Sequence, residues 1–102
     1  MDKTEIIIKL SKYKHLLARH FDLDSVILFG SYAKGTQRED SDIDIDVAVV
    51  VNSIQGDFFS YAPLLWKLRR EIDDRIEPVL LDKNNDSSGF LQEIQRTGLV
   101  IN

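Results

Sequence analysis

Residues 25–51 read SVILFGSYAKGTQREDSDIDIDVAVVV, and this stretch decides the fold. It opens with a short apolar run that predicts a buried strand at 25–29, ending at Gly30, because the run is too short for a helix. Two glycines and many polar residues then predict a loop over 30–41. Acidic and aliphatic residues alternate at the start of 42–51, which predicts a second strand with one acidic and one aliphatic face.

The acidic face of the second predicted strand has the chemistry of a cation site. Asp42, Asp44 and Asp46 are spaced two residues apart, so their side chains point the same way. Like charges on one face disfavour the strand unless cations lie between them, and Mg²⁺ prefers one or two carboxylates together with substrate phosphates. Gly30 and Ser31, at the end of the first strand, let backbone N–H groups and a hydroxyl approach phosphate oxygens closely. The two strands together therefore predict a site for Mg²⁺ and phosphate.

The remainder of the chain completes a small α+β pattern. Three helices and a third strand are predicted, at residues 4–21, 58–73, 90–96 and 76–81. Pro63 is expected in the first turn of the second helix, where its missing N–H costs least. The order helix, strand, strand, helix, strand, helix predicts an α/β two-layer arrangement, a small mixed sheet flanked by helices. We expect one domain over residues 1–102.

Composition excludes several classes of protein. The 102 residues carry 13 Lys and Arg against 17 Asp and Glu, a net charge of −4, which argues against direct nucleic-acid binding. No apolar run approaches the roughly 20 residues needed to cross a bilayer, and the first residues lack the apolar core of a signal peptide. The absence of cysteine excludes disulfides and a thiol nucleophile. We therefore expect a cytoplasmic protein that has no membrane partner.

Two other ligand-binding motifs fail at specific positions. Gly30 and Gly35 have the spacing of a P-loop, but Thr36 stands where that motif requires lysine. The alternating aspartates open like an EF-hand, but Val47 replaces the turn glycine and Ser53 the bidentate glutamate.

The pattern Gly30-Ser31, ten residues, Asp42-Ile43-Asp44 resembles the signature of the polymerase-β-like nucleotidyltransferase superfamily, and most closely its minimal nucleotidyltransferases. Residues 75–79, RIEPV, resemble the strand that bears the third carboxylate of these enzymes, here Glu77. The segment 93–98 is similar to their closing helix.

This resemblance implies a polymerase-β-like core and assigns roles to the site residues. Ser31 and the loop that begins at Gly30 would bind the β- and γ-phosphates of ATP. Asp42, Asp44 and Glu77 would be the catalytic residues and the metal ligands, with the two aspartates coordinating two Mg²⁺ ions. Glu77 would complete one metal site and help to deprotonate the attacking hydroxyl.

The sequence departs from the family pattern at two positions, and it leaves the roles of two loop cations undecided. The third acid is Glu77 rather than the commoner aspartate, and Asp46 is an additional acid on the same face. Lys34 and Arg38 in the loop have the charge to contact phosphates, although solvated loop cations explain them equally well. The sequence does not assign the nucleobase.

Minimal nucleotidyltransferases of this size resemble the antitoxins of two-gene modules whose toxin is a HEPN-domain ribonuclease. The resemblance implies transfer of AMP from ATP to a tyrosine of that toxin, within a hetero-oligomer. Two alternatives stay open: a non-catalytic antitoxin that acts by binding alone, and transfer of the nucleotide to a small molecule such as an aminoglycoside.

Overall fold

We describe residues 3–30, 44–52 and 58–102 of a computed structural model of the chain, with the backbone alone for residues 58–61. Their helices and strands follow the predicted order. The elements are α1 (Lys3–Leu17), β1 (Leu23–Leu28), β2 (Ile45–Val51), α3 (Phe58–Arg69), β3 (Ile76–Asp82), α4 (Phe90–Thr97) and β4 (Leu99–Val100).

The strands form a mixed sheet in the order β3-β2-β1-β4. β1 pairs antiparallel with β2 and with β4, whereas β2 and β3 are parallel. Parallel neighbours need a long crossover, which α3 supplies between β2 and β3. The prediction of an α+β fold with a small mixed sheet is confirmed.

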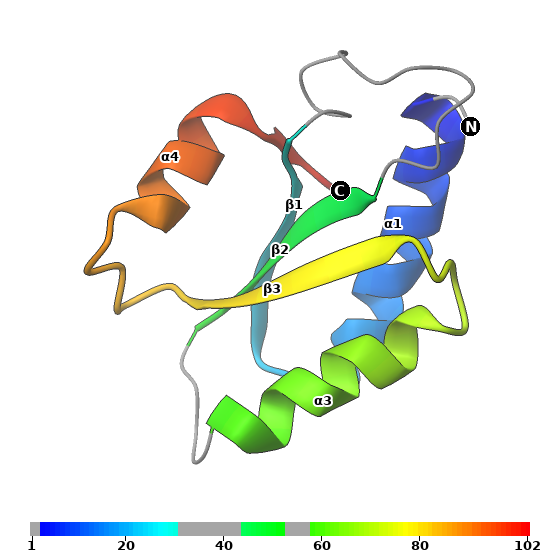
Figure 1. Ribbon diagram of the computed structural model, residues 1–102, viewed down its shortest axis with the longest axis horizontal. Helices are drawn as coiled ribbons and strands as arrows, with labels where there is room; N and C mark the ends of the chain where they lie inside the picture. Colours follow the sequence, from blue (N-terminus) through cyan, green and yellow to red (C-terminus); the bar gives the residue numbers. More distant parts are fainter. Residues whose placement is uncertain (1–2, 31–43, 53–57) are drawn as a thin grey trace.

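One face of the sheet carries the main core. α1 and α3 pack against it, and Figure 1 shows the strands lying between these two helices and α4. From β2, the aliphatic face predicted by the alternation lies here, with Ile45, Val47 and Val49 fully buried. Tyr13 of α1 is buried among them and donates a hydrogen bond from its hydroxyl to the carbonyl oxygen of Leu65, 2.8 Å away. This bond joins α1 to α3.

The opposite face of the sheet is covered in part by α4. Leu91 and Ile94 of α4 pack against Ile27 of β1 and against Ala48 and Val50 of β2. Asp46 lies on this same face, two residues before Ala48, because side chains alternate along a strand. The face therefore changes from acidic to apolar within one strand.

Several boundaries differ from the predicted ones. β1 spans Leu23–Leu28 rather than 25–29. α3 ends at Arg69 rather than at 73, because the next three amides bond to carbonyls three residues back.

α1 ends at Leu17 rather than at 21, because the amides of Arg19 and His20 bond to carbonyls three residues back and tighten the chain into a turn. Pro63 lies inside α3, beyond its first turn, because the helix begins at Phe58. The first part of the predicted 42–51 strand, up to residue 43, lies outside the described residues.

The two-residue strand β4 was not predicted. It follows Gly98, where an added Cβ would lie 2.8 Å from the carbonyl oxygen of Leu28 and 2.7 Å from a methyl of Ile27. Glycine therefore lets the chain run close beside β1, and Ile101 then donates a backbone hydrogen bond to Val26. None of the helices in the described part of the chain has the length and apolar character to cross a membrane.

Candidate active site

Three strand ends meet at one edge of the sheet. β1 runs antiparallel to β2, so the end of β1 lies beside the start of β2, and the parallel strand β3 starts at the same edge. The register places Asp46 beside Glu77, and the amide of Phe29 donates to the carbonyl oxygen of Asp46 at 3.0 Å. Chain segments far apart in the sequence therefore bring acidic side chains together at this edge.

Three of the five predicted site residues are described. Gly30, Asp44 and Glu77 all lie at this edge, at the end of β1, just before β2 and near the start of β3. The carboxyl groups of Asp44 and Glu77 lie within hydrogen-bonding reach of each other when one of them is protonated, so two acids separated by more than thirty residues of sequence are close together. Ser31 and Asp42 lie outside the described residues.

Gly30 is required by its surroundings. Its φ of +75° lies in the left-handed region, and a Cβ added there would come within 2.5 Å of Oδ2 of Asp46. Any other residue would strain the backbone and collide with this carboxylate. The glycine thus allows the chain to leave β1 directly alongside the acidic face of β2.

The surroundings at this edge disfavour ionisation of Asp46 and Glu77. Partial burial raises the pKa of Asp46, and the charge of Asp44 adds to the increase. The pKa of Glu77 is raised by desolvation, by its hydrogen bond to Asp44 and by the charges of Asp44 and Asp46, while the charge of Arg69 acts in the opposite direction. A bound cation would reverse these interactions, because it favours the charged carboxylates.

The donor set at this edge fits a hard divalent cation. Carboxylate oxygens from Asp44 and Glu77 are in contact, and Mg²⁺ takes oxygen ligands of this kind. Within residues 3–30, 44–52 and 58–102, no group of three or more His, Cys, Asp or Glu side chains is arranged to hold a metal ion. Asp42, which lies outside these residues, and the phosphates of a nucleotide are the other oxygen donors that the sequence predicts.

Arg69, at the end of α3, supports the strand that bears Glu77. Its guanidinium donates to the carbonyl oxygen of Ile76 at 3.1 Å and also bonds to the carbonyl oxygen of Asp74. The same group lies 4.6 Å from the ring centre of Trp66. Sequence reasoning did not single out Arg69, since one arginine at a helix end has no distinctive pattern.

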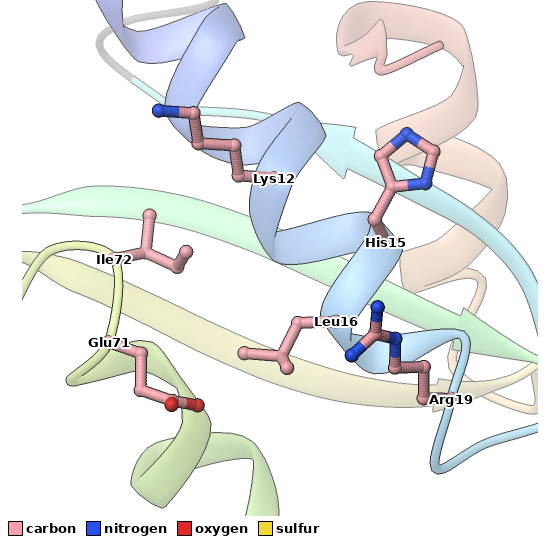
Figure 2. A pocket seen from close by; sticks show the side chains of 6 residues that line it. All are labelled: Lys12, His15, Leu16, Arg19, Glu71 and Ile72. Atoms are coloured by element: carbon pink, nitrogen blue, oxygen red, sulfur yellow. The ribbon is translucent and has the colours of Figure 1, made fainter.

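A cleft on another part of the molecule is lined mainly by basic and aliphatic side chains, unlike the acidic edge of the sheet. It measures about 350 Å³ and is lined by Lys12, His15, Leu16, Arg19, Glu71 and Ile72. Figure 2 shows these side chains around the space between α1 and the turn that follows α3. Leu16 and Ile72 also pack against the main core, so this cleft belongs to the face opposite the acids. Of the predicted site residues that the structure describes, Gly30, Asp44 and Glu77, none lines it.

Comparison with known proteins identifies the fold and the family. The family described as "Polymerase beta, Nucleotidyltransferase" matches residues 11–102. A protein of Methanocaldococcus jannaschii, named as a candidate protein adenylyltransferase, is 36% identical over 74 residues, which cover 72% of this chain and 73% of the relative. Residues 11–102, which match the family, span the positions of all five predicted site residues.

Two solved structures share the fold. A candidate nucleotidyltransferase from Sulfolobus solfataricus superposes with a TM-score of 0.71 at 19% identity, covering 96% of this chain and 80% of the other. The structure described as "toxin-antitoxin with AMP-PNP" contains a chain with a TM-score of 0.60 at 27% identity, covering 99% of this chain and 73% of that one. Together with the family match, these likenesses show that the chain belongs to the polymerase-β nucleotidyltransferase family, as one of its minimal nucleotidyltransferases.

Proposed function

We propose that this nucleotidyltransferase transfers AMP from ATP to a hydroxyl group, a tyrosine in our proposal, of a HEPN-family toxin and thereby acts as its antitoxin. The observation that carries the proposal is the contact between Asp44 and Glu77 at the edge where β1 ends. This contact brings the second aspartate of the family signature together with the third acid. In our proposal residues 1–102 act as one domain in the cytoplasm.

We assign the roles of the acids from their charge and from the resemblance to the family signature. Asp42, Asp44 and Glu77 would hold Mg²⁺, while the loop that starts at Gly30-Ser31 would bind the β- and γ-phosphates of ATP. Two Mg²⁺ ions, when bound, supply positive charge to the attacking oxygen and to the leaving pyrophosphate. Glu77 would remain ionised in that state, because the cations reverse the repulsion that raises its pKa.

The transfer itself is a single displacement at phosphorus. The acceptor oxygen forms a bond to the α-phosphorus, and the bond from that phosphorus to the bridging oxygen breaks as pyrophosphate leaves. Glu77 assists removal of the acceptor proton, a role open to the ionised carboxylate that it retains when the cations are bound. The acids precede the residues packed under α4 on the same face of the sheet, and in our proposal the acceptor approaches them there.

A partner chain supplies the acceptor in this proposal. About 100 residues suffice for the sheet and its covering helices but leave little chain for a separate acceptor domain. Support comes from the relative named as a candidate protein adenylyltransferase and from the neighbour solved as a toxin-antitoxin with AMP-PNP. The HEPN identity of the partner rests on the resemblance of the sequence motifs.

The test is intact mass spectrometry of the toxin encoded beside this chain, after incubation with this protein, ATP and Mg²⁺. We expect the toxin to gain mass in AMP units with the wild type and to gain none with Asp44→Asn or Glu77→Gln. Glu71→Gln is the matched control, because Glu71 is an exposed acid in the cleft on the opposite face. This control should transfer AMP as the wild type does.

Two outcomes would contradict the proposal. A stable complex without any mass gain would favour the non-catalytic antitoxin. Mass gain on an aminoglycoside, with none on the toxin, would favour the small-molecule alternative. Omission of Mg²⁺ and addition of a chelator should abolish the gain, since the acids alone do not neutralise the triphosphate.

A further inference from the structure

An aromatic side chain lies directly beside the acids. Phe29 precedes Gly30, and its backbone hydrogen bond to Asp46 places the two residues opposite each other on neighbouring antiparallel strands. Opposed residues project to the same face, and Phe29 packs against the cluster formed with α4. Its half-buried ring therefore extends the acidic edge toward α4.

A second aromatic ring continues this surface outward. Phe90, the first residue of α4, meets Phe29 edge to face, with ring centres 5.9 Å apart and an interplanar angle of 89°. Yet 41% of Phe90 remains exposed. Val79, two residues after Glu77 on the same face of β3, is exposed as well. Apolar surface thus adjoins the carboxylates instead of being covered.

The other exposed aromatic ring in the described part of the chain is less suited to bind a flat ligand at these acids. Trp66 belongs to α3, which packs on the opposite face of the sheet. The Arg69 guanidinium already lies over its ring. The Phe90 ring has an edge contact with Phe29 and retains exposed surface for stacking.

We propose that Phe90, held in place by Phe29, is the residue against which the nucleobase of the bound nucleotide stacks. The proposal rests on the proposed function, because it assumes that the triphosphate is bound at the acids. Base–aromatic stacking tolerates any nucleobase, since every base has a flat π-face. Phe90 therefore contributes affinity for the nucleoside part and little choice between adenine and guanine.

Binding of ATP and of inorganic tripolyphosphate, each with Mg²⁺ and measured by titration calorimetry on the full chain, tests this assignment. The wild type should bind ATP more tightly than tripolyphosphate, because the latter has no base. Phe90→Ala and Phe90→Leu should weaken ATP binding by about tenfold, in line with the loss of one base–aromatic stack, while tripolyphosphate binding stays unchanged. Phe90→Trp should retain the affinity for ATP.

The leucine variant keeps apolar bulk against Phe29 and so separates loss of stacking from loss of packing. Ile8→Ala is the matched surface control, since Ile8 is 51% exposed on α1, on the other side of the sheet. It should bind both ligands as the wild type does.

Each contrary result has a distinct meaning. Unchanged ATP binding in Phe90→Ala, or equal weakening of ATP and tripolyphosphate, would overturn the role of Phe90. Equal affinity of the wild type for both ligands would also overturn it while leaving the phosphate site intact. Failure of the wild type to bind either ligand would overturn the proposed function itself, and the assignment of Phe90 with it.

Discussion

The two faces of the sheet differ in how they are covered, and β2 contributes to both. On the α1 and α3 side, Ile45, Val47 and Val49 are fully buried in the main core. On the α4 side, Asp46 precedes Ala48 and Val50, and only the latter two belong to the buried cluster. One face of the sheet therefore supplies most of the apolar burial, whereas on the other face the buried cluster does not extend to the acids.

The largest expected effect is on the covered face. Leu10→Ala should lower the free energy of unfolding by about 2–5 kcal/mol, because it leaves a cavity around a fully buried side chain. Ile8→Ala in the same helix removes an exposed side chain and should change it by less than about 0.5 kcal/mol. Urea titration measures both. Similar losses in the two variants would show that α1 does not bury the face we assign.

Gly30 and Gly89 allow a sharper comparison. Both have a positive φ, of 75° and 76°, but only Gly30 has Asp46 within 4 Å of an added Cβ. Gly89→Ala should cost about 1 kcal/mol from backbone strain, and Gly30→Ala at least about 1 kcal/mol more. Combining Gly30→Ala with Asp46→Ala should recover most of the additional loss. No recovery in the urea midpoint would mean that the carboxylate is not the obstacle.

Asp73 is an acid with the opposite electrostatic environment. Burial acts to raise its pKa, but hydrogen bonds from Lys9 and Arg75, each at 2.8 Å, outweigh burial and lower the pKa to about 2. The ionised form is therefore favoured in the folded state. This stabilisation is present above the unfolded pKa of 3.8 and is lost as the pH falls toward 2.

Asp73→Asn should accordingly destabilise the protein by about 1 kcal/mol at pH 7, since the ion pairs involved are partly exposed. The difference between variant and wild type should shrink as the pH approaches 2. Thermal unfolding followed across this range provides the check. A constant difference at all pH values would show that the ionised carboxylate is not the source.

The smallest effect on stability is expected for Glu77, at the edge of the sheet where β1 ends and β2 and β3 begin. Glu77→Gln removes an acid whose pKa is raised by desolvation and by its acidic neighbours, so the free energy of unfolding should stay within about 0.5 kcal/mol or increase slightly. Because its folded pKa lies above its unfolded value of 4.5, this carboxylate begins to oppose folding as the pH rises through 4.5, and the full effect is present above the folded pKa. Marked destabilisation of the metal-free protein would indicate a structural role for Glu77 instead.

The division of β2 into an aliphatic face and an acidic face follows from the sequence, because side chains alternate along a strand. A period of two separates Ile45, Val47 and Val49 from Asp44 and Asp46, whatever the rest of the fold does. The contact between Asp44 and Glu77 required more, because it depends on a parallel register set by the crossover through α3. The family resemblance supplied that link, and the register agrees with it.

Other features have no local signal. β4 has only two residues, too few for any periodicity, and it pairs because Gly98 permits a close approach to β1. The position of Arg69 against Ile76, and that of Phe90 against Phe29, depends on where whole helices pack. Tertiary contacts decide these positions, so patterns along the chain do not predict them.

The stabilisation of the folded chain by ATP and Mg²⁺, followed as the shift in thermal midpoint, tests the central claim most directly. A ligand that binds only the folded state raises its stability in proportion to the logarithm of its concentration over Kd. We predict a rise for the wild type and for Glu71→Gln, and little or none for Asp44→Asn and Glu77→Gln. A full rise in the last two variants would contradict the assignment of the nucleotide and metal site to this edge of the sheet.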